Sequence, residues 1–561
     1  MPAYDVLIIG AGLAGPRAAL AAAEAGVSVA IVSKGHPGRS HSTAAAGGIN
    51  AALKPGDSWE SHAYDTVKGS DYLGDQDAIE LMCRAAPEEI LHLEHLGVTF
   101  HRNDAGELGT RAFGGASADR TFYVADITGQ ALLHVLYEQL LGHESTVDRL
   151  EEWYVTSLLR GDDGRCTGAI ARDLRTGQLE ALAAKSVILA TGGAGQVFRP
   201  TTNALICTGD GISLAYRIGC PLMDMEMIQY HPTTLVENGL LITEGARGEG
   251  ARLFNVKGER FMERYAPNKL ELASRDVVSQ AEQTEINEGR GFPDGGLALD
   301  ITYVARKRIL EALREIVHIG RDFAGVDITR EPIHIRPGMH YIMGGVKTNS
   351  WGETSVPGLY AAGECACVSV HGGNRLGANS LLDTLIFGGR AGRHAAKRAA
   401  DVAMPSPSEA RLKDEQAWLD AIMAREHAGR RVAEISQELG ETMNRHCAVF
   451  RDAEGLAKAL EIVRRLKEEA QRAWIDDRSA VFNQDVIALI ELGHKLDVAE
   501  AIVVAAIERT ESRGAQFRTD FPRRDDEQWL KHITVSANGA EPEIGYAPVT
   551  ITRWEPEERH Y

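Results

Sequence analysis

A glycine-rich turn near the start of the chain constrains the fold more than any other feature. Residues 4–9 are an apolar run typical of a strand, and an alanine-rich helical pattern covers residues 17–25. Between them, residues 10–15 have the spacing G-x-G-x-x-G, and a second apolar strand pattern follows at 27–32. Strand, turn, helix and strand in this order predict a βαβ unit whose turn binds the phosphates of a dinucleotide.

The residue types in the turn suit this chemistry. Gly10 allows the tight turn, Gly12 lets a pyrophosphate approach the backbone, and Gly15 lets helix and strand pack closely. The N-terminus of the helix then offers free N–H groups and a partial positive charge. We therefore expect the whole stretch to bind the cofactor, namely Gly10, Ala11, Gly12, Leu13, Ala14 and Gly15.

The end of the second strand separates the possible cofactors. An NAD site has an acidic residue here that binds the ribose, whereas this chain has Ser33 and Lys34. This departure argues against an ordinary NAD site and favours FAD. We count Ser33 and Lys34 among the expected cofactor-binding residues.

Size, charge and cysteine content limit the possible classes of protein. A chain of 561 residues needs more than one domain, and a net charge of −19 disfavours nucleic acid as a partner. The seven cysteines are scattered without a C-x-x-C pair, which fits reduced thiols and predicts no metal or iron–sulfur site. No apolar run is long enough to span a bilayer and no signal-peptide pattern is present, so we expect the chain itself to be soluble and cytoplasmic.

Residues 38–48 read Gly-Arg-Ser-His-Ser-Thr-Ala-Ala-Ala-Gly-Gly. This stretch resembles the flavin-attachment segment of succinate dehydrogenase and fumarate reductase flavoprotein subunits. The resemblance implies that FAD is bonded covalently to His41. One departure is Ala46, where many relatives carry a polar residue. The neighbouring residues expected to contact the cofactor are Ser40, Ser42, Gly47 and Gly48.

The resemblance covers nearly the whole chain. Further matching stretches are residues 229–233, 241–250, 273–279, 340–345 and 371–383. It implies an α/β fold, in which a Rossmann-like FAD-binding domain carries an inserted α+β capping domain and a C-terminal helical domain. The expected boundaries are 1–222 and 346–404 for the FAD-binding domain, 223–345 for the capping domain, 405–530 for the helical domain and 531–561 for a C-terminal tail with a strand at 549–552.

Later motifs add expected cofactor contacts. Asp210 could be only a helix cap, but the resemblance implies a contact with FAD. Glu364 could be a solvated charge, but by resemblance it meets the FAD ribose and supplies the acidic residue missing after the second strand. A helix beginning near Ser380 would direct its N–H groups at the flavin, so we expect contacts from Asn379, Ser380 and Leu381.

The resemblance also implies the substrate, succinate or fumarate. Arg375 can bind one carboxylate bidentately, and His340 can share that end. His231 and Thr243 can hold the other end. Phe113 lies in a stretch similar to the family loop that carries a phenylalanine over the substrate, although a core phenylalanine is the alternative.

The chemistry needs a hydride acceptor and a base. Succinate oxidation removes a hydride and a proton from neighbouring carbons, and FAD takes the hydride because no side chain can. By resemblance Arg275 is the base, with Glu244 and Arg247 relaying the proton. Free guanidinium is almost never deprotonated, so the positive charge of Arg247 would help by making Arg275 a better acid.

Partners follow from the same resemblance. FAD accepts two electrons together and this chain has no cysteine cluster to pass them on singly, so we expect an iron–sulfur subunit. Membrane anchor subunits would hold both on the cytoplasmic face of the cell membrane and provide access to quinone. The direction, succinate oxidation or fumarate reduction, stays open.

Two alternatives are weighed against this interpretation. L-aspartate oxidase shares the fold, the arginine and the dicarboxylate clamp but binds FAD without a covalent bond, so His41 disfavours it. A non-catalytic FAD-binding or RNA-modification scaffold is disfavoured by the acidic charge and by the complete set of dicarboxylate residues.

Overall fold

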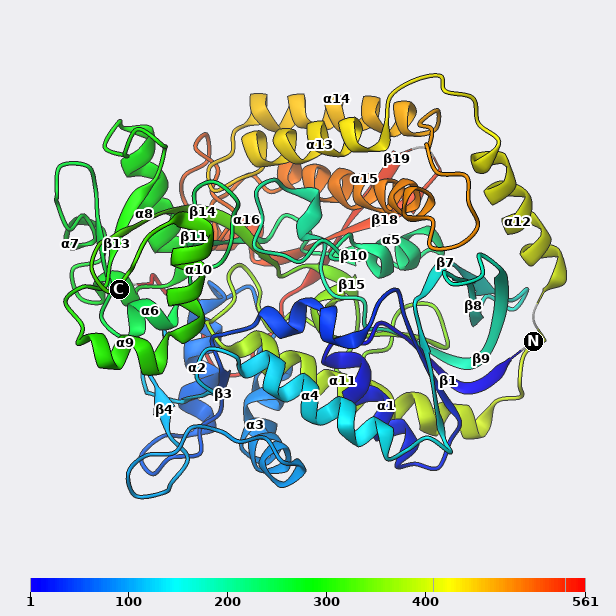
Figure 1. The fold of residues 1–561 in the computed structure, drawn as a ribbon, viewed down its shortest axis with the longest axis horizontal. Coiled ribbons are helices and arrows are strands. Elements are labelled where there is room, and N and C mark those ends of the chain that lie inside the picture. The colour runs from blue at the N-terminus through cyan, green and yellow to red at the C-terminus, as the bar shows by residue number, and fades with distance from the viewer. Residues whose placement is uncertain (1, 407, 540, 560–561) are drawn as a thin grey trace.

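The structure, a computed structural model, describes residues 2–406, 408–539 and 541–559. In Figure 1 the N-terminal strands and helices form one part, the green segment from the middle of the chain projects at one end, and long yellow and orange helices lie along another side. We call residues 223–345, which include this green segment, the capping segment. These parts meet around the cavity described below.

A seven-stranded sheet carries the predicted βαβ unit. Its order is β6-β2-β1-β9-β8-β7, and β16 pairs with β9 beyond the end of β8. Strands β6, β2, β1, β9 and β16 run parallel, whereas β7 and β8 are antiparallel to their neighbours. The strands are β1 (Ala3–Ile9), β2 (Val29–Ser33), β6 (Val147–Glu151), β7 (Trp153–Arg160), β8 (Cys166–Asp173), β9 (Leu179–Leu189) and β16 (Leu359–Ala361).

Helices α1 (Ala14–Ala23) and α11 (Asn379–Asp401) pack closely beside this sheet. Their backbones approach because α11 has glycines at the contact. A Cβ atom at Gly392 would lie 2.2 Å from the carbonyl oxygen of Ala18. The other elements of this part are α2 (Trp59–Gly69), α3 (Gln76–Leu96), α4 (Thr128–Leu141), α5 (Asp210–Arg217), β3 (Ile49–Asn50), β4 (Thr110–Arg111), β5 (Thr121–Phe122), η1 (Pro37–Arg39), η2 (His41–Ala44), η3 (Gly195–Val197) and η5 (Gly363–Cys365).

The capping segment has a sheet and an apolar core of its own. The antiparallel sheet has the order β11-β14-β13-β12, and its core includes Leu253, Phe261, Leu297 and Ile335. The elements are β11 (Ile228–Leu235), β12 (Arg252–Phe254), β13 (Leu297–Asp300), β14 (Ile333–Ile342), α6 (Gly245–Gly248), α7 (Met262–Tyr265), η4 (Leu270–Leu272), α8 (Arg275–Asn287), α9 (Arg306–Ala312) and α10 (Arg314–Ala324).

Short strands mark both crossings between the two parts. A five-stranded sheet with the order β17-β15-β10-β18-β19 joins them to the C-terminal strands. Chain segments at both boundaries of the capping segment therefore share one sheet with the C-terminal hairpin. These strands are β10 (Leu222–Met223), β15 (Gly345–Lys347), β17 (Ala366–Cys367), β18 (Lys531–Asn538) and β19 (Glu541–Pro548).

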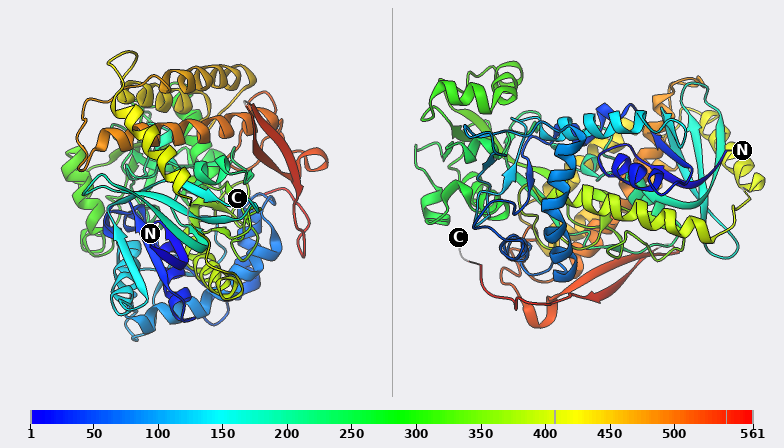
Figure 2. Two further views of the ribbon diagram at one scale, coloured as in Figure 1. Left: turned by 90° about the vertical axis from the view of Figure 1, so that its right-hand side faces the viewer. Right: turned by 90° about the horizontal axis from the view of Figure 1, so that it is seen from below.

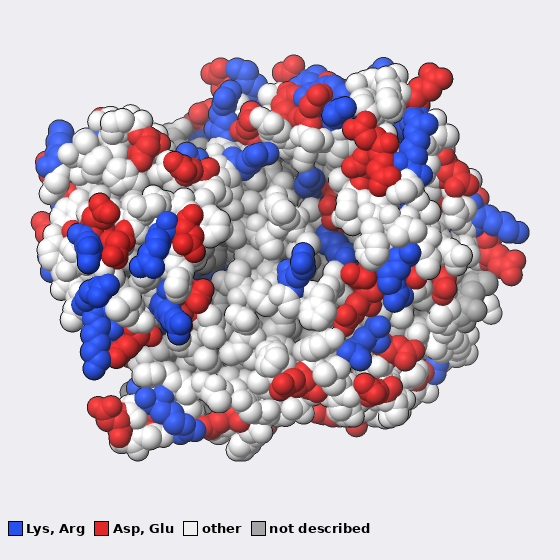
Figure 3. Space-filling model, in the orientation of Figure 1, with Lys and Arg blue, Asp and Glu red and all other residues white. Residues whose placement is uncertain are grey.

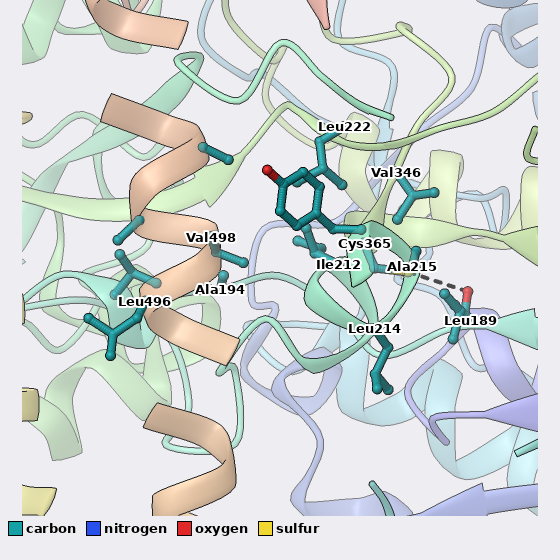
Figure 4. Close-up of a cluster of buried hydrophobic side chains, with 14 of the residues drawn as sticks. Leu189, Ala194, Ile212, Leu214, Ala215, Leu222, Val346, Cys365, Leu496 and Val498 are labelled. Carbon is teal, nitrogen blue, oxygen red and sulfur yellow. Dashed lines mark hydrogen bonds between the residues drawn. The ribbon is translucent and has the colours of Figure 1, made fainter. Parts of the chain in front are cut away.

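The C-terminal helices bury the largest hydrophobic core together with the first sheet. Figure 4 shows a part of it, in which Val498 of α15 lies beside Ala194, and the thiol of Cys365 donates to the carbonyl oxygen of Leu189. The helices are α12 (Glu409–Met423), α13 (Val432–His446), α14 (Ala453–Ala470), α15 (Gln484–Glu508) and α16 (Asp526–Trp529).

The prediction of a strand at 549–552 is wrong. The tail strands are β18 and β19, which pair as a hairpin, and residues 549–552 follow them without a strand partner. Their backbone groups bond to α3 instead: the N–H of Thr550 donates to the Asp75 carboxylate at 2.6 Å, and the N–H of Gln76 donates to the Thr550 carbonyl at 2.9 Å. Figure 2 shows this red segment running along one side of the molecule.

Membrane-spanning helices and metal-binding clusters are both absent from the described residues. Within residues 2–406, 408–539 and 541–559, no helix combines the length and the apolar character needed to cross a membrane. In the same ranges, no group of three or more His, Cys, Asp or Glu side chains is arranged to hold a metal ion. The seven cysteines are buried and free.

Candidate active site

One cavity of about 810 Å³ extends from the carboxyl ends of β1 and β2 to the capping segment. Figure 3 shows the surface hollowed between the capping segment and the rest of the molecule, with mostly uncharged atoms in the hollow. Most of the predicted site residues line the cavity, namely Gly10, Ala11, Gly12, Leu13, Ala14, Ser33, Lys34, Ser40, His41, Ser42, Gly47, Gly48, Phe113, Asp210, His231, Thr243, Glu244, Arg275, His340, Glu364, Arg375, Ser380 and Leu381.

Two glycines of the turn, Gly10 and Gly15, have no room for a side chain. A Cβ atom at Gly10, whose φ is +110°, would stand 2.2 Å from the carbonyl oxygen of Ala190. A Cβ atom at Gly15 would stand 2.0 Å from the carbonyl oxygen of Gly10, so this glycine lies under the turn instead of lining the cavity. Gly10, Gly12, Gly47 and Gly48 line the cavity and form a cradle with exposed backbone that fits a flat dinucleotide such as FAD.

Lys34 and Asp210 form an ion pair at the nucleotide end. The ammonium of Lys34 lies 2.7 Å from Asp210 and 2.6 Å from Glu491 of α15, and Asp210 also lies 3.1 Å from Nδ1 of His494. Burial alone would lower the pKa of Lys34, but the two carboxylates outweigh it and raise this pKa. Asp210 of α5 and Glu491 of α15 thus place two carboxylates at the end of β2, where both pair with Lys34, and sequence reasoning missed Glu491 and His494.

His41 lies in η2 on the cavity wall. Its Nδ1 accepts a hydrogen bond from the N–H of Ala204 at 3.3 Å. Desolvation, aided by the nearby charge of Arg375, lowers the pKa of His41 to about 4. The imidazole is therefore neutral at pH 7, with Nδ1 occupied and Nε2 left for another partner.

Two other predicted cofactor residues lie in unlike surroundings. Glu364 follows β16, which β9 and β1 separate from β2, and its carboxylate accepts from the N–H of Ile342 at 3.2 Å. Burial raises the pKa of Glu364 to about 7. Asn379 does not line the cavity: its side chain bonds to Asn50, His62 and Thr66 in the interior. At the start of α11, Ser380 and Leu381 face the cavity in its place.

Arg375 dominates the substrate end. Its side chain is 3% exposed, donates to the hydroxyl of Ser380 at 3.0 Å and lies 4.4 Å from the ring centre of Tyr341. Burial, followed by repulsion from Arg275, lowers the pKa of Arg375 to about 9. A buried guanidinium without a neighbouring carboxylate pair is suited to bind an anion.

The other predicted substrate residues surround Arg375. The rings of His231 and His340 lie 4.9 Å apart, and burial together with Arg275 holds the pKa of both far below its ordinary value. Thr243 is 2% exposed at the same wall. Phe113 is tightly confined, since a Cβ atom at Gly47 would stand 2.8 Å from its ring.

Arg275, the first residue of α8, is the centre of the predicted relay. Its Nε donates to Glu244 at 2.7 Å and its Nη1 donates to the amide oxygen of Gln229 at 2.9 Å. Glu244 also accepts from the N–H of Gly114 at 2.8 Å. Burial alone would raise the pKa of Glu244, but Arg275 and Arg247 lower it, so the carboxylate is ionised at pH 7.

Arg247 lies behind Glu244 and outside the cavity. Its Nη2 is 3.6 Å from Glu244 and its Nη1 donates to the carbonyl oxygen of Glu271 at 2.6 Å. Burial lowers the pKa of Arg247. Glu282, seven residues after Arg275, is wholly buried, and within the described residues neither carboxylate oxygen has a hydrogen-bond partner.

Side chains that sequence reasoning did not select hold the site together. Gln229 donates from Nε2 to Asn374 at 2.8 Å and to the carbonyl oxygen of Arg375 at 2.8 Å, so it links both active-site arginines. Asn374 in turn donates to Asp276 at 3.1 Å. Gln229, Asn374 and Asp276 stand inside the recognised motifs, which was the only available signal for them.

Comparisons with known proteins agree with this geometry. The family model described as FAD binding domain matches residues 5–381, and the model described as fumarate reductase flavoprotein C-term matches residues 436–561. The fumarate reductase flavoprotein subunit of Mycobacterium tuberculosis (strain H37Rv) is 46% identical, covering 100% of this chain and 99% of its own length. The chain belongs to the succinate dehydrogenase and fumarate reductase flavoprotein subunit family.

Further relatives carry either name of this family. The succinate dehydrogenase flavoprotein subunit of Rickettsia conorii is 44% identical over 98% of this chain and 96% of its own. A solved chain of E. coli quinol fumarate reductase has a TM-score of 0.95 at 38% identity and covers 100% of this chain and 99% of that chain. Proteins of this family are FAD-dependent oxidoreductases, so the predicted family, fold class and enzyme class are confirmed.

Proposed function

We propose that this chain is the flavoprotein subunit of a succinate:quinone oxidoreductase and interconverts succinate and fumarate at FAD bonded to His41. The observation that carries the proposal is the location of Arg275. It lies in the wall of the cavity that contains Arg375, with Glu244 2.7 Å behind it. FAD supplies a hydride acceptor at this end of the cavity, a role that no side chain can fill.

A four-carbon dicarboxylate matches the charges and donors of the substrate end. Arg375 binds one carboxylate together with His340, and His231 with Thr243 binds the other. Nδ1 of His231 accepts from the N–H of Thr233 at 3.2 Å, so the neutral ring carries its proton on Nε2 and donates there. The positive charge that holds the dianion therefore comes from Arg375 rather than from the histidines, since the charge of Arg275 is paired with Glu244.

The proton moves through Arg275. In fumarate reduction Arg275 gives a proton to the substrate carbon and takes one from the relay, and succinate oxidation reverses these steps. Glu244 connects it to Arg247, whose lowered pKa brings that guanidinium closer to exchanging a proton. The hydrogen bond from Arg275 to Gln229 keeps the guanidinium in one orientation.

His41 is suited to carry the flavin covalently. Its Nδ1 accepts from the N–H of Ala204 and its pKa is about 4, so the neutral ring carries its proton on Nε2, and a bond from Nε2 to the flavin would replace that proton. The glycine turn of residues 10–15 is a separate segment of the cavity wall, although the N–H of Leu13 donates to the hydroxyl of Ser42, the neighbour of His41, at 3.1 Å. We therefore expect FAD to bind through the turn without the covalent bond.

The relatives support the proposed partners. The similar E. coli chain is from quinol fumarate reductase, and a similar Mycobacterium smegmatis Sdh1 chain, with a TM-score of 0.86 at 35% identity, was solved in complex with UQ1. We extend this setting to the present chain: an iron–sulfur subunit takes its electrons, and membrane anchor subunits hold both on the cytoplasmic face of the cell membrane and provide the quinone site.

One experiment tests the activity and the attachment together. The FAD-loaded complex should reduce an artificial dye with succinate and should oxidise a reduced dye with fumarate; the ratio of the two rates bears on the direction. After acid denaturation of the wild type, flavin fluorescence should stay on the polypeptide band. The His41→Ala variant should still bind some FAD when folded, but it should release all of this FAD on denaturation. Rapid oxidation of L-aspartate with release of hydrogen peroxide and no succinate activity would replace this proposal with L-aspartate oxidase.

A further inference from the structure

Residues 549–559, here called the tail segment, lie across the FAD-binding part rather than extending into solvent. The amide oxygen of Gln76 accepts from the backbone N–H groups of Thr552, Arg553 and Trp554 at 2.9–3.1 Å. The carboxylate of Glu557 accepts from the hydroxyls of two tyrosines of this part. The tail segment therefore follows a defined path along α3 and α2.

Arg559 lies at the end of this path and connects two parts of the molecule. Its Nε lies 3.0 Å from the carboxylate of Asp71, in the loop between α2 and α3. Its Nη2 donates to Asp276 at 2.6 Å, the second residue of α8 in the capping segment. The side chain of Asp276 is 1% exposed and that of Arg559 is 13% exposed, so solvent screens this pair only weakly.

A continuous chain of hydrogen bonds leads from this ion pair to the active site. Asn374 donates to the other carboxylate oxygen of Asp276 at 3.1 Å, and Gln229 donates to Asn374 at 2.8 Å. Gln229 then accepts from Arg275 at 2.9 Å. Gln229, Asn374 and Asp276 are 0–4% exposed, so water does not compete for these bonds.

The direction of the chain follows from its charged end. A carboxylate only accepts hydrogen bonds, so the amide nitrogen of Asn374 must face Asp276 and its oxygen must face Gln229. The Gln229 nitrogen must then face Asn374, which leaves its oxygen for Arg275. A rotated Gln229 amide would present N–H groups to the guanidinium and repel it. The carboxylate of Asp276, which Arg559 binds at its other oxygen, thus fixes the amide that holds Arg275, together with the carbonyl oxygen of Arg375 that accepts from Gln229.

We propose that Arg559 is a positioning residue for the proton-transferring Arg275, and that the tail segment holds the capping segment against the FAD-binding part through Asp71 and Asp276. This inference rests on the proposed function, because it assigns Arg559 to the same reaction. Loss of Arg559 would leave the buried carboxylate of Asp276 without its cation, one residue away from Arg275.

The test compares two arginines of the tail segment in the FAD-loaded complex with its partner subunits. Arg559→Ala should lower kcat for succinate oxidation by about ten- to a hundredfold, since small displacements of a catalytic group have effects of this size. FAD content and malonate affinity should change less than about threefold. Arg559→Lys should recover part of the loss. Arg553→Ala, which removes a contact with Glu80 and Trp59 instead, should keep the wild-type kcat.

A double-mutant cycle with Asp276→Asn separates positioning from general loosening of the tail. If the two residues act through one contact, Arg559→Ala should add little to the loss in kcat caused by Asp276→Asn. Independent, multiplying effects, or equal losses in Arg553→Ala and Arg559→Ala, would overturn the inference. So would an Arg559→Ala complex with bound FAD and wild-type kcat and KM. Failure of the wild-type complex to use succinate or fumarate would instead reject the proposed function.

Where Arg559→Ala fails to assemble, Arg559→Lys and Asp276→Asn carry the test. If the orientation of Arg275 has changed in Arg559→Lys, the dependence of kcat on pH should differ from that of the wild type. A lowered melting temperature with an unchanged profile and unchanged kcat would show a purely structural role and overturn the inference.

Discussion

Two buried arginines of this chain differ in what surrounds them. In the C-terminal part, Arg509 is 0% exposed and donates to Glu226 at 2.7 Å and Glu511 at 3.0 Å. It also donates to the carbonyl oxygens of Trp529 and Lys531 at 3.0 and 2.9 Å. Burial alone would lower the pKa of Arg509, but Glu226 and Glu511 outweigh it and raise this pKa.

Arg375 in the cavity is buried almost as deeply but lacks such partners. Within the part of the chain that the structure describes, its Nε has no hydrogen-bond partner, and burial with the charge of Arg275 lowers its pKa to about 9. Burial by itself therefore does not distinguish a structural arginine from one that binds a ligand. The difference is the carboxylates: Arg509 has them already, and in the proposed function Arg375 gains them from a substrate.

The largest effect is expected for Arg275→Gln. This substitution removes the proposed proton-transferring group and keeps the residues that bind the dicarboxylate. Its kcat should fall by about 10²–10⁴-fold in both directions, the range of general acid–base catalysis. FAD content and malonate affinity should stay nearly unchanged, because the clamp remains. Arg308→Gln, an exposed arginine of the capping segment paired with Glu249, is the control and should have no effect. A raised KM with normal kcat would make Arg275 a binding residue.

Arg509→Met tests the structural side of the comparison. It leaves Glu226 buried without its cation, while Glu511 keeps Arg513, so the free energy of unfolding should fall by about 3–5 kcal/mol. Chemical denaturation of the variant and of Arg375→Met provides the measurement. Arg375→Met should leave stability within about 1 kcal/mol of wild type, since it strands no paired carboxylate. Equal losses in both variants would remove the distinction.

Arg375→Ala tests the ligand-binding side. Malonate should bind more weakly by about 2–5 kcal/mol, whereas the monocarboxylate butyrate should bind poorly to both proteins. The pKa of about 9 adds a dependence on pH: Arg375 is charged below this value, so malonate affinity should fall as pH rises through it. Calorimetric titrations at pH 7 and pH 10 should show this fall in the wild type and a smaller one in the variant. Equal wild-type affinity for malonate and butyrate would contradict the clamp.

Glu282→Gln should have the smallest effect. It should raise the free energy of unfolding, whereas the substitutions above lower stability, activity or affinity. Burial raises the pKa of Glu282 far above that of the unfolded chain, so its contribution to stability is present at low pH and is lost as pH rises. At pH 8 the variant should be more stable than wild type by about 1–2 kcal/mol, with the gain shrinking toward pH 5.

The matched control for Glu282 is Glu285 on the same helix. It bonds to Asn255, Tyr265 and Arg290, and although burial opposes it, these partners lower its pKa to about 2. Glu285→Gln should therefore reduce stability at pH 8. Thermal melts of both variants across pH 5–8 measure the contrast, and a stabilising Glu285→Gln would show that burial rather than pairing decides.

Local sequence motifs were enough to predict which residues lie together at the cavity when each residue belongs to one short pattern. The glycine turn predicts its own backbone geometry, and Arg375, with His340 and His231, was found on its motif and lies at the same cavity. The hydrogen-bond chain from Arg559 to Arg275 could not be predicted from the sequence. Asn374 bonds to Asp276 and Gln229, which are 98 and 145 positions away, and Arg559 bonds to Asp276, which is 283 positions away. Pairings of this kind depend on tertiary structure, which no local pattern records.

One local prediction failed for a clear physical reason. The β-branched run at 549–552 has strand propensity, but Asp75 and Gln76 take its backbone groups, so contacts with distant elements outweigh local preference. The cofactor contact expected of Asn379 stays a prediction; its side chain faces the interior, while Ser380, about 100° further around the helix, faces the cavity.

The late position of the tail segment in the sequence has a consequence for the timing of assembly. Residues 1–404, which supply nearly all of the cavity wall, leave the ribosome before β18 and the tail segment exist. At about 5–20 residues per second, the remaining residues up to 559 take on the order of ten seconds or more. During this interval the capping segment lacks both β18 beside its crossing strands and Arg559 at α8. The capping segment is therefore held at its crossing strands and at α8 only after residues 531–559 have been translated.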